Sequence, residues 1–557
     1  MDAYKVYAEW LSDPFVKTED KEYLKSIIED KALVEELFCR DLSFGTAGMR
    51  GKIGVGTNRI NIYQVAKATQ AYANHLINTG VNEAGVAIAY DTRHKSKEFA
   101  ETAARVLLGN NVPVYLFEGI RSVPELSFTV RYLNTAGGIV ITASHNPKEY
   151  NGYKLYSKYG GQLVPDAMMP IIDEFSKMDS FRQIKMYDQD FKQHPLFTSL
   201  GNEVDEKYYE AILKLQRNPD IKKEDIKIVY SPLHGTGMYA VPEVLKRSGF
   251  TKVYVTAEQN CIDPDFSTVN VPNPENAEAL DMSIKLADKH NADIVMATDP
   301  DCDRVGIAVK EDVGKYIILN GNQIGALLID YLIHGDGNIP ENAVVIQTIV
   351  TSNLGKNIAE KAGVEVREVL TGFKYIGEMM TRFEEDKKNT FLFGYEESYG
   401  FLSGNHAQDK DAVNACLLLA EMAAFYKTQN KTVYDRLTEI YEQFGYYFEY
   451  LYNITFEGID GMAKMDNILS KIRNHPLREI DGEKVTVTDY LMENTGLPKE
   501  NVLKFNMESG SWVALRPSGT EPKFKIYFSC VDKSMQKSEE KCQRIKTEIL
   551  TKLITNN

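Results

Sequence analysis

Three segments of the chain repeat one pattern of apolar runs and amphipathic stretches. In the first segment, strands are predicted at 86–90, 112–117 and 138–142, with helical patterns between them. The same strand–helix–strand–helix–strand order recurs at 226–297 and again at 343–393. Short apolar runs rich in β-branched residues are typical of parallel strands that are buried on both faces. We therefore predict an α/β protein with three similar domains, each containing a mixed, mostly parallel sheet.

The two ends of the chain depart from this pattern. Residues 1–40 carry apolar side chains at helical spacing, which predicts one or two helices packed on the surface. In the C-terminal part, strands are indicated at 485–488, 512–515 and 524–528, and a charged amphipathic helix is indicated at 534–554. These elements predict a fourth domain of the α+β class.

The predicted domain limits follow these changes of pattern. We place the domains at 1–204, 205–320, 321–449 and 450–557. Right-handed crossovers between parallel strands bring the loops that follow those strands to one edge of each sheet. Because the third strand of every repeat ends in a loop rich in polar residues, we expect the three loops to meet in a central cleft.

Composition and charge narrow the classes of function. Of the 557 residues, 43% are hydrophobic and 26% charged, as in globular proteins with a large core. Six scattered cysteines without a Cys-x-x-Cys spacing indicate reduced thiols, and no apolar signal segment begins the chain. The net charge of −15 argues against sequence-independent nucleic-acid binding. The most apolar stretch, 416–426, is too short for a membrane span and contains Glu421. We expect a cytoplasmic protein that binds neither nucleic acid nor a membrane. No pattern in the sequence assigns an oligomeric state.

The loop after the strand at 138–142 contains Ser144 beside His145, and Lys154 follows a few residues later. Its place at the carboxyl end of a strand is where open α/β sheets position their chemistry. Ser144 can therefore carry a transferable acyl or phosphoryl group. In the alternative interpretation, Ser144 and Asn146 only cap backbone groups of an ordinary turn.

The corresponding loop of the second repeat contains Asp299, Asp301 and Asp303. Three carboxylates directly after a buried strand are costly unless a cation lies among them. Oxygen ligands at this spacing suit a hard divalent cation such as Mg²⁺, although an acidic surface turn has the same pattern. An EF-hand is disfavoured because its twelfth position is Lys310. Zinc is disfavoured because the loop lacks histidine and because the side chain of Cys302 is expected to point opposite to those of its neighbours on an extended backbone.

Two glycine-rich loops each contain one cation. Arg50 lies in the loop 43–51, and Lys374 follows Gly372 in the loop 371–374. Glycines allow backbone N–H groups to approach an anion, so both loops can hold a phosphate. Each loop can equally be a plain turn with an exposed cation. A third glycine-rich loop, 234–237, is better explained by close packing at a strand end.

Two further loops can recognise the rest of a phosphorylated sugar. Glu396, Glu397 and Ser398 follow the third strand of the last repeat, where they can form a general acid/base pair, accept from sugar hydroxyls or form a solvated acidic turn. The segment from Arg516 to Lys523 offers a guanidinium, hydroxyls, backbone N–H groups and a second cation, which together favour a phosphate site over a simple Pro-Ser-Gly turn.

These motifs together resemble the α-D-phosphohexomutase family, which comprises phosphoglucomutases and phosphomannomutases. The resemblance covers nearly the whole chain, and its signatures occur in the family's order: TASHNP with NGYK, DPDCDR, GYEES and RPSGTEP. The segment FGTAGMRG near the start favours the phosphoglucomutase-2-like branch. The chain departs from the common pattern at Tyr395 and Tyr399, where many members have glycine.

The resemblance implies a four-domain molecule whose site lies at its centre. It implies that Ser144 is a phosphoserine that shares Mg²⁺ with Asp299, Asp301 and Asp303. Around the reacting phosphoryl group it implies Arg50, His145, Lys154, Arg304 and Lys374, with the general base open among His145, Lys154 and Lys374. For the rest of the substrate it implies Gly372, Glu396, Ser398, Arg516, Ser518, Gly519, Thr520 and Lys523.

The implied reaction interconverts α-D-glucose 1-phosphate and glucose 6-phosphate through glucose 1,6-bisphosphate, which is both intermediate and activator. Mannose or pentose phosphates, and net synthesis of glucose 1,6-bisphosphate, are alternatives within the same chemistry. A non-catalytic phosphosugar-binding protein is an alternative of another class. A Ser/His hydrolase is disfavoured because the chain lacks a Gly-x-Ser-x-Gly elbow and His145 is adjacent to Ser144 in sequence.

Overall fold

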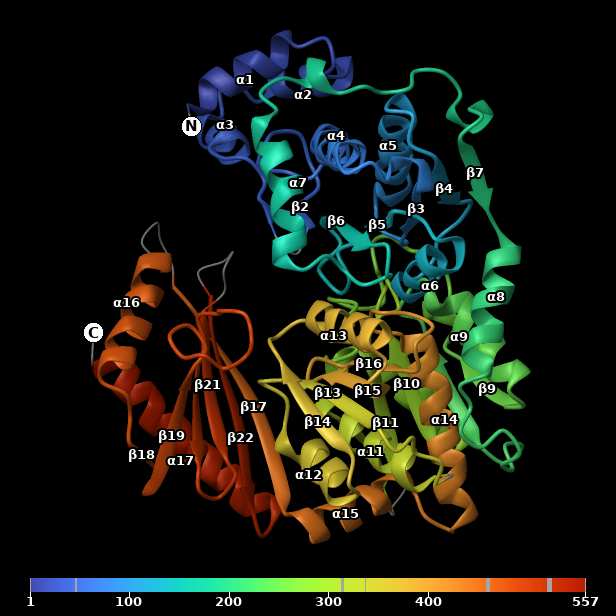
Figure 1. Ribbon diagram of the computed structural model, residues 1–557, viewed down its shortest axis with the longest axis vertical. Helices are drawn as coiled ribbons and strands as arrows, with labels where there is room; N and C mark the ends of the chain where they lie inside the picture. The colour runs from blue at the N-terminus through green and yellow to red at the C-terminus, as the bar shows by residue number, and fades with distance from the viewer. Residues whose placement is uncertain are drawn as a thin grey trace.

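The computed structural model describes residues 2–45, 48–311, 315–335, 337–456, 461–517 and 523–555. Four sheets follow one another along the chain (Figure 1). Three belong to α/β units in which helices cover the sheet, and the fourth is an antiparallel sheet at the C-terminal end. This arrangement confirms the predicted fold class.

The first sheet has the strand order β1-β2-β6-β5-β3-β4-β7. Its strands are β1 (Phe44–Gly45), β2 (Gly48–Lys52), β3 (Val86–Tyr90), β4 (Val114–Phe117), β5 (Gly137–Ile141), β6 (Tyr150–Ser157) and β7 (Phe197–Leu200). Its helices are α4 (Ile62–Asn78), α5 (Ser96–Gly109), α6 (Val123–Leu133) and α7 (Pro165–Lys177). Alternate residues of β3 pack against opposite helical layers: Val86 and Ile88 join α4, α5 and α7, whereas Ala87 and Ala89 join α6. Burial on both faces explains the unbroken apolar run.

The second and third sheets repeat this plan, with orders β12-β11-β10-β8-β9 and β14-β13-β15-β16. The second sheet comprises β8 (Lys227–Ser231), β9 (Lys252–Val255), β10 (Ile294–Thr298), β11 (Val305–Lys310) and β12 (Tyr316–Leu319). The third comprises β13 (Ala343–Thr348), β14 (Glu365–Val369), β15 (Thr390–Glu396) and β16 (Gly400–Ser403). The helices of this region are α8 (Asn202–Leu213), α9 (Gly237–Arg247), α10 (Ala277–His290), α11 (Gly321–His334), α12 (Asn353–Lys361), α13 (Phe373–Asp386), α14 (Ala412–Thr428) and α15 (Val433–Phe444).

The three α/β units share one topology. In each, the first strand lies between the second and third strands and is parallel to both. The third strand then turns into an antiparallel partner: β5 into β6, β10 into β11, and β15 into β16. The polar loops singled out in the sequence occupy these three equivalent turns.

The fourth sheet is wholly antiparallel among its described strands, in the order β17-β22-β21-β20-β19-β18. Its elements are β17 (Tyr446–Thr455), α16 (Gly461–Asn474), β18 (Glu479–Ile480), β19 (Glu483–Asp489), β20 (Leu503–Met507), β21 (Trp512–Pro517), β22 (Lys523–Asp532) and α17 (Met535–Thr555). One face packs on α16 and α17, and the other, which includes Trp512 and Tyr527, packs on the third unit through Ile349 and Leu370.

The N-terminal region differs from its prediction of one or two helices. It forms three: α1 (Ala3–Ser12), α2 (Thr18–Ser26) and α3 (Lys31–Phe38). The Asp13 side chain bonds the backbone of Phe15 after α1, and Asp30 caps the start of α3, so the single periodic pattern is broken twice. Short 3₁₀ turns lie at Asn82–Ala84, Phe181–Gln183, Phe191–Gln193 and Ala257–Gln259.

Helix α14 contains the most apolar stretch and is buried on all sides. Its Glu421 is fully buried and accepts a hydrogen bond from the backbone N–H of Arg217, which agrees with the expected core helix. Among the described residues, no helix is both long and apolar enough to cross a bilayer.

A buried ion pair ties helices α11 and α15 together. Arg436 donates from Nη2 to Asp330 Oδ1 at 2.6 Å and from Nε to Oδ2 at 2.8 Å, and Tyr426 donates to the same carboxylate. Although burial favours the neutral acid, the hydrogen bonds from Arg436 and His334 lower the pKa of Asp330 to about 2.

We expect Arg436→Met to lower the free energy of unfolding by about 3 kcal/mol, because it leaves Asp330 buried without its cation. Arg382→Met removes an exposed pair with Glu378 and should cost less than about 1 kcal/mol. Urea denaturation measures both. The pKa of Asp330 is lowered from 3.8 to about 2. The difference in unfolding free energy between wild type and Arg436→Met should therefore be fully present above pH 3.8 and shrink as the pH falls toward 2. Equal losses at pH 7 would contradict this assignment.

Candidate active site

Ser144 lies in the turn between β5 and β6, and its backbone is held in the left-handed region at φ 51°. The guanidinium of Arg93 shapes this turn by donating to the carbonyl oxygens of Ser144 and Asn146, both at 2.5 Å, and of Pro147 at 2.9 Å. Arg93 is itself buried and packs over the ring of Phe266 at 5.0 Å. The serine loop is therefore fixed by side chains from outside it.

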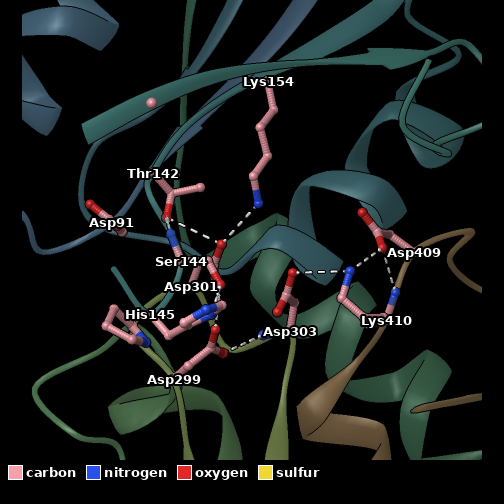
Figure 2. Close-up of polar contacts among 12 residues, drawn as sticks. Asp91, Thr142, Ser144, His145, Lys154, Asp299, Asp301, Asp303, Asp409 and Lys410 are labelled. Atoms are coloured by element: carbon pink, nitrogen blue, oxygen red, sulfur yellow. Dashed lines mark hydrogen bonds and ion pairs between the residues drawn. The ribbon is translucent and has the colours of Figure 1, made fainter. Parts of the chain in front are cut away.

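The Ser144 hydroxyl joins the first unit to the second. Ser144 Oγ donates to Asp299 Oδ2 at 2.7 Å and lies 3.1 Å from His145 Nδ1 (Figure 2). Asp299 also accepts from the backbone N–H groups of Asp303 and Arg304 through its other oxygen. The structure thus brings together the serine and the aspartate loop as the sequence predicted.

The three aspartates of this loop form a group that can hold a metal. One carboxylate oxygen from each of Asp299, Asp301 and Asp303 lies within 4.8 Å of the others, and all three residues are buried. Asp301 Oδ1 and Asp303 Oδ1 are buried without a hydrogen-bond partner. Unpaired carboxylate oxygens in such a site are the donor set that a hard divalent cation requires.

Two lysines approach these carboxylates from different units. Lys154 on β6 reaches Asp301 Oδ2 at 3.2 Å, and Lys410 reaches Asp303 Oδ2 at the same distance (Figure 2). Thr142 also donates to Asp301 Oδ2 at 3.1 Å. Asp301 and Asp303 are therefore each oriented by a separate cation.

Electrostatics set the charge states around the serine. Burial, followed by the charges of Arg304 and Arg50, holds the pKa of His145 well below its usual range, so this imidazole is neutral. Burial and the two neighbouring carboxylates raise the pKa of Asp299 well above its ordinary value. Burial works the same way on Asp303, but Lys410 and the other nearby cations outweigh it and lower the pKa of Asp303.

Two arginines lie at the edges of this centre. Arg50 donates to Asn146 Oδ1 at 3.2 Å from the neighbouring strand β2. Arg304 pairs with Glu275 at 2.5 Å, and its backbone forms a bridge to Gly400 at the start of β16. This bridge connects the second unit to the third beside the predicted sugar loop.

The predicted sugar loop forms the tight turn between β15 and β16. Glu396 is 6% exposed, and burial raises its pKa while the charges of Lys410 and Arg304 oppose the shift. Ser398 is half-buried in the turn itself. Burial and the charge of Glu396 raise the pKa of the adjacent Glu397 to about 7.

The unusual Tyr395 points away from this loop. It alternates with Glu396 along β15, its ring is fully buried against Gly325 and Gly355, and its hydroxyl donates to Gln347. A Cβ atom on either glycine would overlap the ring. The departure from the family pattern is therefore matched by two glycines in the core and adds no side chain to the sugar site.

The fourth sheet presents Arg516 beside the third unit. Its Nε donates to Glu500 Oε1 at 2.8 Å. Lys374, which follows Gly372 at the start of α13, has Glu500 and Arg516 as its charged neighbours, and burial lowers its pKa. Lys523 is exposed at the start of β22. The remaining predicted members of the phosphate loop, Ser518, Gly519 and Thr520, lie outside the described residues.

Three residues of this centre were not predicted from the sequence. Arg93, Asp409 and Lys410 carry no local motif that distinguishes them from surface charges. A signal existed in the polar run 404–411, which stands between two apolar elements and is largely buried in the structure. The predicted packing role of the loop 234–237 is confirmed, since a Cβ on Gly237 would overlap Tyr230 and Cys302.

Comparison with known proteins identifies the class to which this fold and site belong. Models of phosphoglucomutase/phosphomannomutase α/β/α domains I, II and III match residues 41–182, 206–314 and 320–444. The chain belongs to this family, the α-D-phosphohexomutases.

Particular relatives narrow the comparison. The chain is 40% identical to a phosphoglucomutase of Staphylococcus epidermidis over 88% of its length and 90% of the relative's. It is 37% identical to a phosphoglucomutase of Staphylococcus haemolyticus over 95% and 98% of the two chains. The open form of Paramecium parafusin, a phosphoglucomutase, superimposes with a TM-score of 0.69 at 21% identity, covering 91% of this chain and 93% of that one.

Proposed function

We propose that this chain is a phosphoglucomutase, an isomerase that interconverts α-D-glucose 1-phosphate and glucose 6-phosphate through a phosphoserine at Ser144. The observation that carries the proposal is the Ser144 hydroxyl, which is held 2.7 Å from Asp299 inside a group of three buried carboxylates. A phosphosugar-binding protein needs neither this hydroxyl nor these carboxylates. The family and its curated phosphoglucomutases at about 40% identity support the same reaction.

The aspartate loop fits Mg²⁺. Asp301 Oδ1 and Asp303 Oδ1 are buried without a hydrogen-bond partner, and such oxygens suit a small, hard cation. Asp299, Asp301 and Asp303 would hold the ion together with an oxygen of the Ser144 phosphate. When bound, Mg²⁺ neutralises charge on the transferring phosphoryl group.

The reaction on Ser144 consists of two phosphoryl transfers. In the first, the bond between phosphorus and Ser144 Oγ breaks and a bond to the 6-hydroxyl oxygen of glucose 1-phosphate forms, giving glucose 1,6-bisphosphate. The hydroxyl proton passes to a base, and Ser144 Oγ regains a proton, which it shares with Asp299 in the present structure. After the bisphosphate reorients, Ser144 Oγ gives up its proton and forms a bond to the phosphorus of the 1-phosphate. The bond between that phosphorus and the sugar 1-oxygen breaks, this oxygen takes up a proton, and glucose 6-phosphate leaves. Added glucose 1,6-bisphosphate would recharge an unphosphorylated serine and so activate the enzyme.

Three candidates remain for the base: His145, Lys154 and Lys374. The lowered pKa of His145 makes its imidazole neutral, and its Nδ1 lies 3.1 Å from Ser144 Oγ, which favours it. Lys154 is held by Asp301, and Lys374 lies near Arg516.

The remaining residues would bind and orient the sugar. We propose that Arg50, Arg304, Lys154 and Lys374 bind the reacting phosphoryl group. Phosphoryl transfer is accelerated mainly by positioning and charge neutralisation, which these cations would provide. Glu396 and Ser398 would accept from sugar hydroxyls. The non-reacting phosphate would be bound by Gly372, Arg516, Ser518, Gly519, Thr520 and Lys523.

Purified protein with Mg²⁺ and a trace of glucose 1,6-bisphosphate should convert glucose 1-phosphate at least about tenfold faster than mannose, ribose or deoxyribose 1-phosphate. The core position of Tyr395 favours this outcome, because this residue adds no side chain to the sugar loop. Initial rates across this panel measure the preference. A faster rate on mannose or a pentose phosphate would assign the protein to that substrate, and no turnover of any of them would leave a binding protein.

A further inference from the structure

A buried chain of hydrogen bonds runs from the strand that follows the serine loop to the aspartate loop. Tyr156 on β6 donates its hydroxyl to Asp409 Oδ2 at 2.9 Å. Asp409 Oδ1 accepts from Lys410 Nζ at 3.0 Å, and the same ammonium lies 3.2 Å from Asp303 Oδ2 (Figure 2). The chain therefore joins all three α/β units through side chains alone.

The geometry leaves Asp409 little freedom. Besides its bond to Nζ, Asp409 Oδ1 accepts from the backbone N–H of Lys410 at 2.8 Å, and the other oxygen, Oδ2, accepts from Tyr156. Tyr156 is fully buried and Asp409 is 2% exposed, which strengthens these bonds because the surrounding dielectric is low. Loss of the tyrosine hydroxyl would leave one carboxylate oxygen without its donor.

Lys410 is confined along its length. Its aliphatic stem crosses Gly400, where a Cβ would overlap Lys410 Cδ, and its Nζ lies 5.4 Å from the centre of the Phe373 ring. The carboxylates of Asp303, Asp409 and Glu396 raise its pKa despite burial, so it carries a positive charge. The direction of its ammonium therefore depends on how these carboxylates are held.

Strand β6 serves both lysines of the centre. Lys154 and Tyr156 are two residues apart, so their side chains leave the same face of the strand. Lys154 reaches Asp301 directly, whereas Tyr156 acts on Asp303 through Asp409 and Lys410. One strand of the serine unit thus sets the position of a cation at two of the three aspartates.

We propose that Tyr156 is a positioning residue for phosphoryl transfer: it holds Asp409, which fixes the Lys410 ammonium against Asp303. This inference rests on the proposed function. The position of the positive charge at the aspartate loop then depends on how strand β6 of the first unit lies against the segment that contains Asp409 and Lys410.

The test is Tyr156→Phe, which keeps the ring and removes only the hydroxyl. We expect kcat for glucose 1-phosphate to fall about tenfold, the effect of one hydrogen bond to a charged group, with KM changed less than about twofold. Asp409 would then turn its freed oxygen toward Lys410 and draw the ammonium from Asp303. Steady-state kinetics and the midpoint of thermal unfolding are measured together.

Tyr153→Phe is the matched control. Tyr153 lies on the same strand with its side chain in the opposite helical layer, is fully buried, and its hydroxyl bonds Thr69 Oγ1 at 3.1 Å. It should lose no more thermal stability than Tyr156→Phe and keep kcat within about twofold of wild type, because its hydroxyl bonds a neutral partner outside the site. A similar kcat for the two variants would overturn the proposal.

A double-mutant cycle tests whether Tyr156 acts through Asp409. Asp409→Asn should lower kcat, and adding Tyr156→Phe should lower it no further, because the carboxylate that the tyrosine orients is already lost. Losses that multiply would overturn the proposal. Wild-type turnover is measured first: a wild type without activity refutes the proposed function and this inference with it, whereas an active wild type with an unaffected Tyr156→Phe refutes this inference alone.

Discussion

Ser144→Ala is expected to lower the rate of glucose 1-phosphate conversion by at least about a thousandfold, because removal of a covalent nucleophile abolishes the route that depends on it. Ser144 Oγ is the hydroxyl that the structure places on Asp299 at 2.7 Å. The neighbouring hydroxyl of Thr142 is already engaged with Asp301 and with the backbone N–H of Ser144, so it cannot substitute. A coupled assay for glucose 6-phosphate measures the loss.

Two further measurements make this prediction specific. Intact mass should show one phosphoryl group on wild-type protein treated with glucose 1,6-bisphosphate and none on Ser144→Ala. Ser283→Ala is the control, because Ser283 on helix α10 is fully buried and its hydroxyl bonds Thr256, which is not a residue of the site, at 2.8 Å. The control should keep both activity and phosphate. A Ser144→Ala protein as active as wild type would exclude the phosphoserine.

The sequence predicted three mixed sheets and located their parallel strands, but it did not locate the antiparallel strand that follows the third strand of each unit. Parallel strands such as β3 are buried on both faces, so they stand out as unbroken apolar runs. Strand β6 does not, because it contains Asn151, Gly152 and Lys154. Its Asn151 is buried because the side chain bonds the His94 carbonyl and Ser96, and such compensation depends on contacts distant in sequence.

The candidate site divides in the same way. Ser144 and the aspartates belong to contiguous motifs. They lie close together because the loops that carry them follow equivalent strands of units with the same topology. Arg93 and Lys410 reach this centre through Ser144 and Asp303, which lie far from them in the sequence, so no local spacing predicts their role. Tyr395 is the opposite case, because it lies within a motif but its role is in the core. It departs from the family pattern because its side chain packs against Gly325 and Gly355.

Asp301→Asn is the second change with a large expected effect. Asp301 provides a buried oxygen without a partner at Oδ1, while Oδ2 orients Lys154 and Thr142. An amide keeps the shape and loses the charge that a divalent cation requires. Because even outer-shell partners of a metal typically cost 10–100-fold when mutated, we expect activity at a fixed Mg²⁺ concentration to fall by at least about a hundredfold.

A measurement without turnover separates metal binding from catalysis. In wild type, Mg²⁺ at about one hundred times its dissociation constant should stabilise the folded state by about 2.7 kcal/mol, since it binds only that state. The accompanying rise in the thermal unfolding midpoint should vanish in Asp301→Asn. Asp265→Asn should retain it, because Asp265 is exposed and pairs with His94 and Lys148 outside the buried group. If Mg²⁺ raised the midpoint of Asp301→Asn as much as that of wild type, the cation would bind elsewhere, and the unpaired oxygens of the aspartate loop would need another explanation.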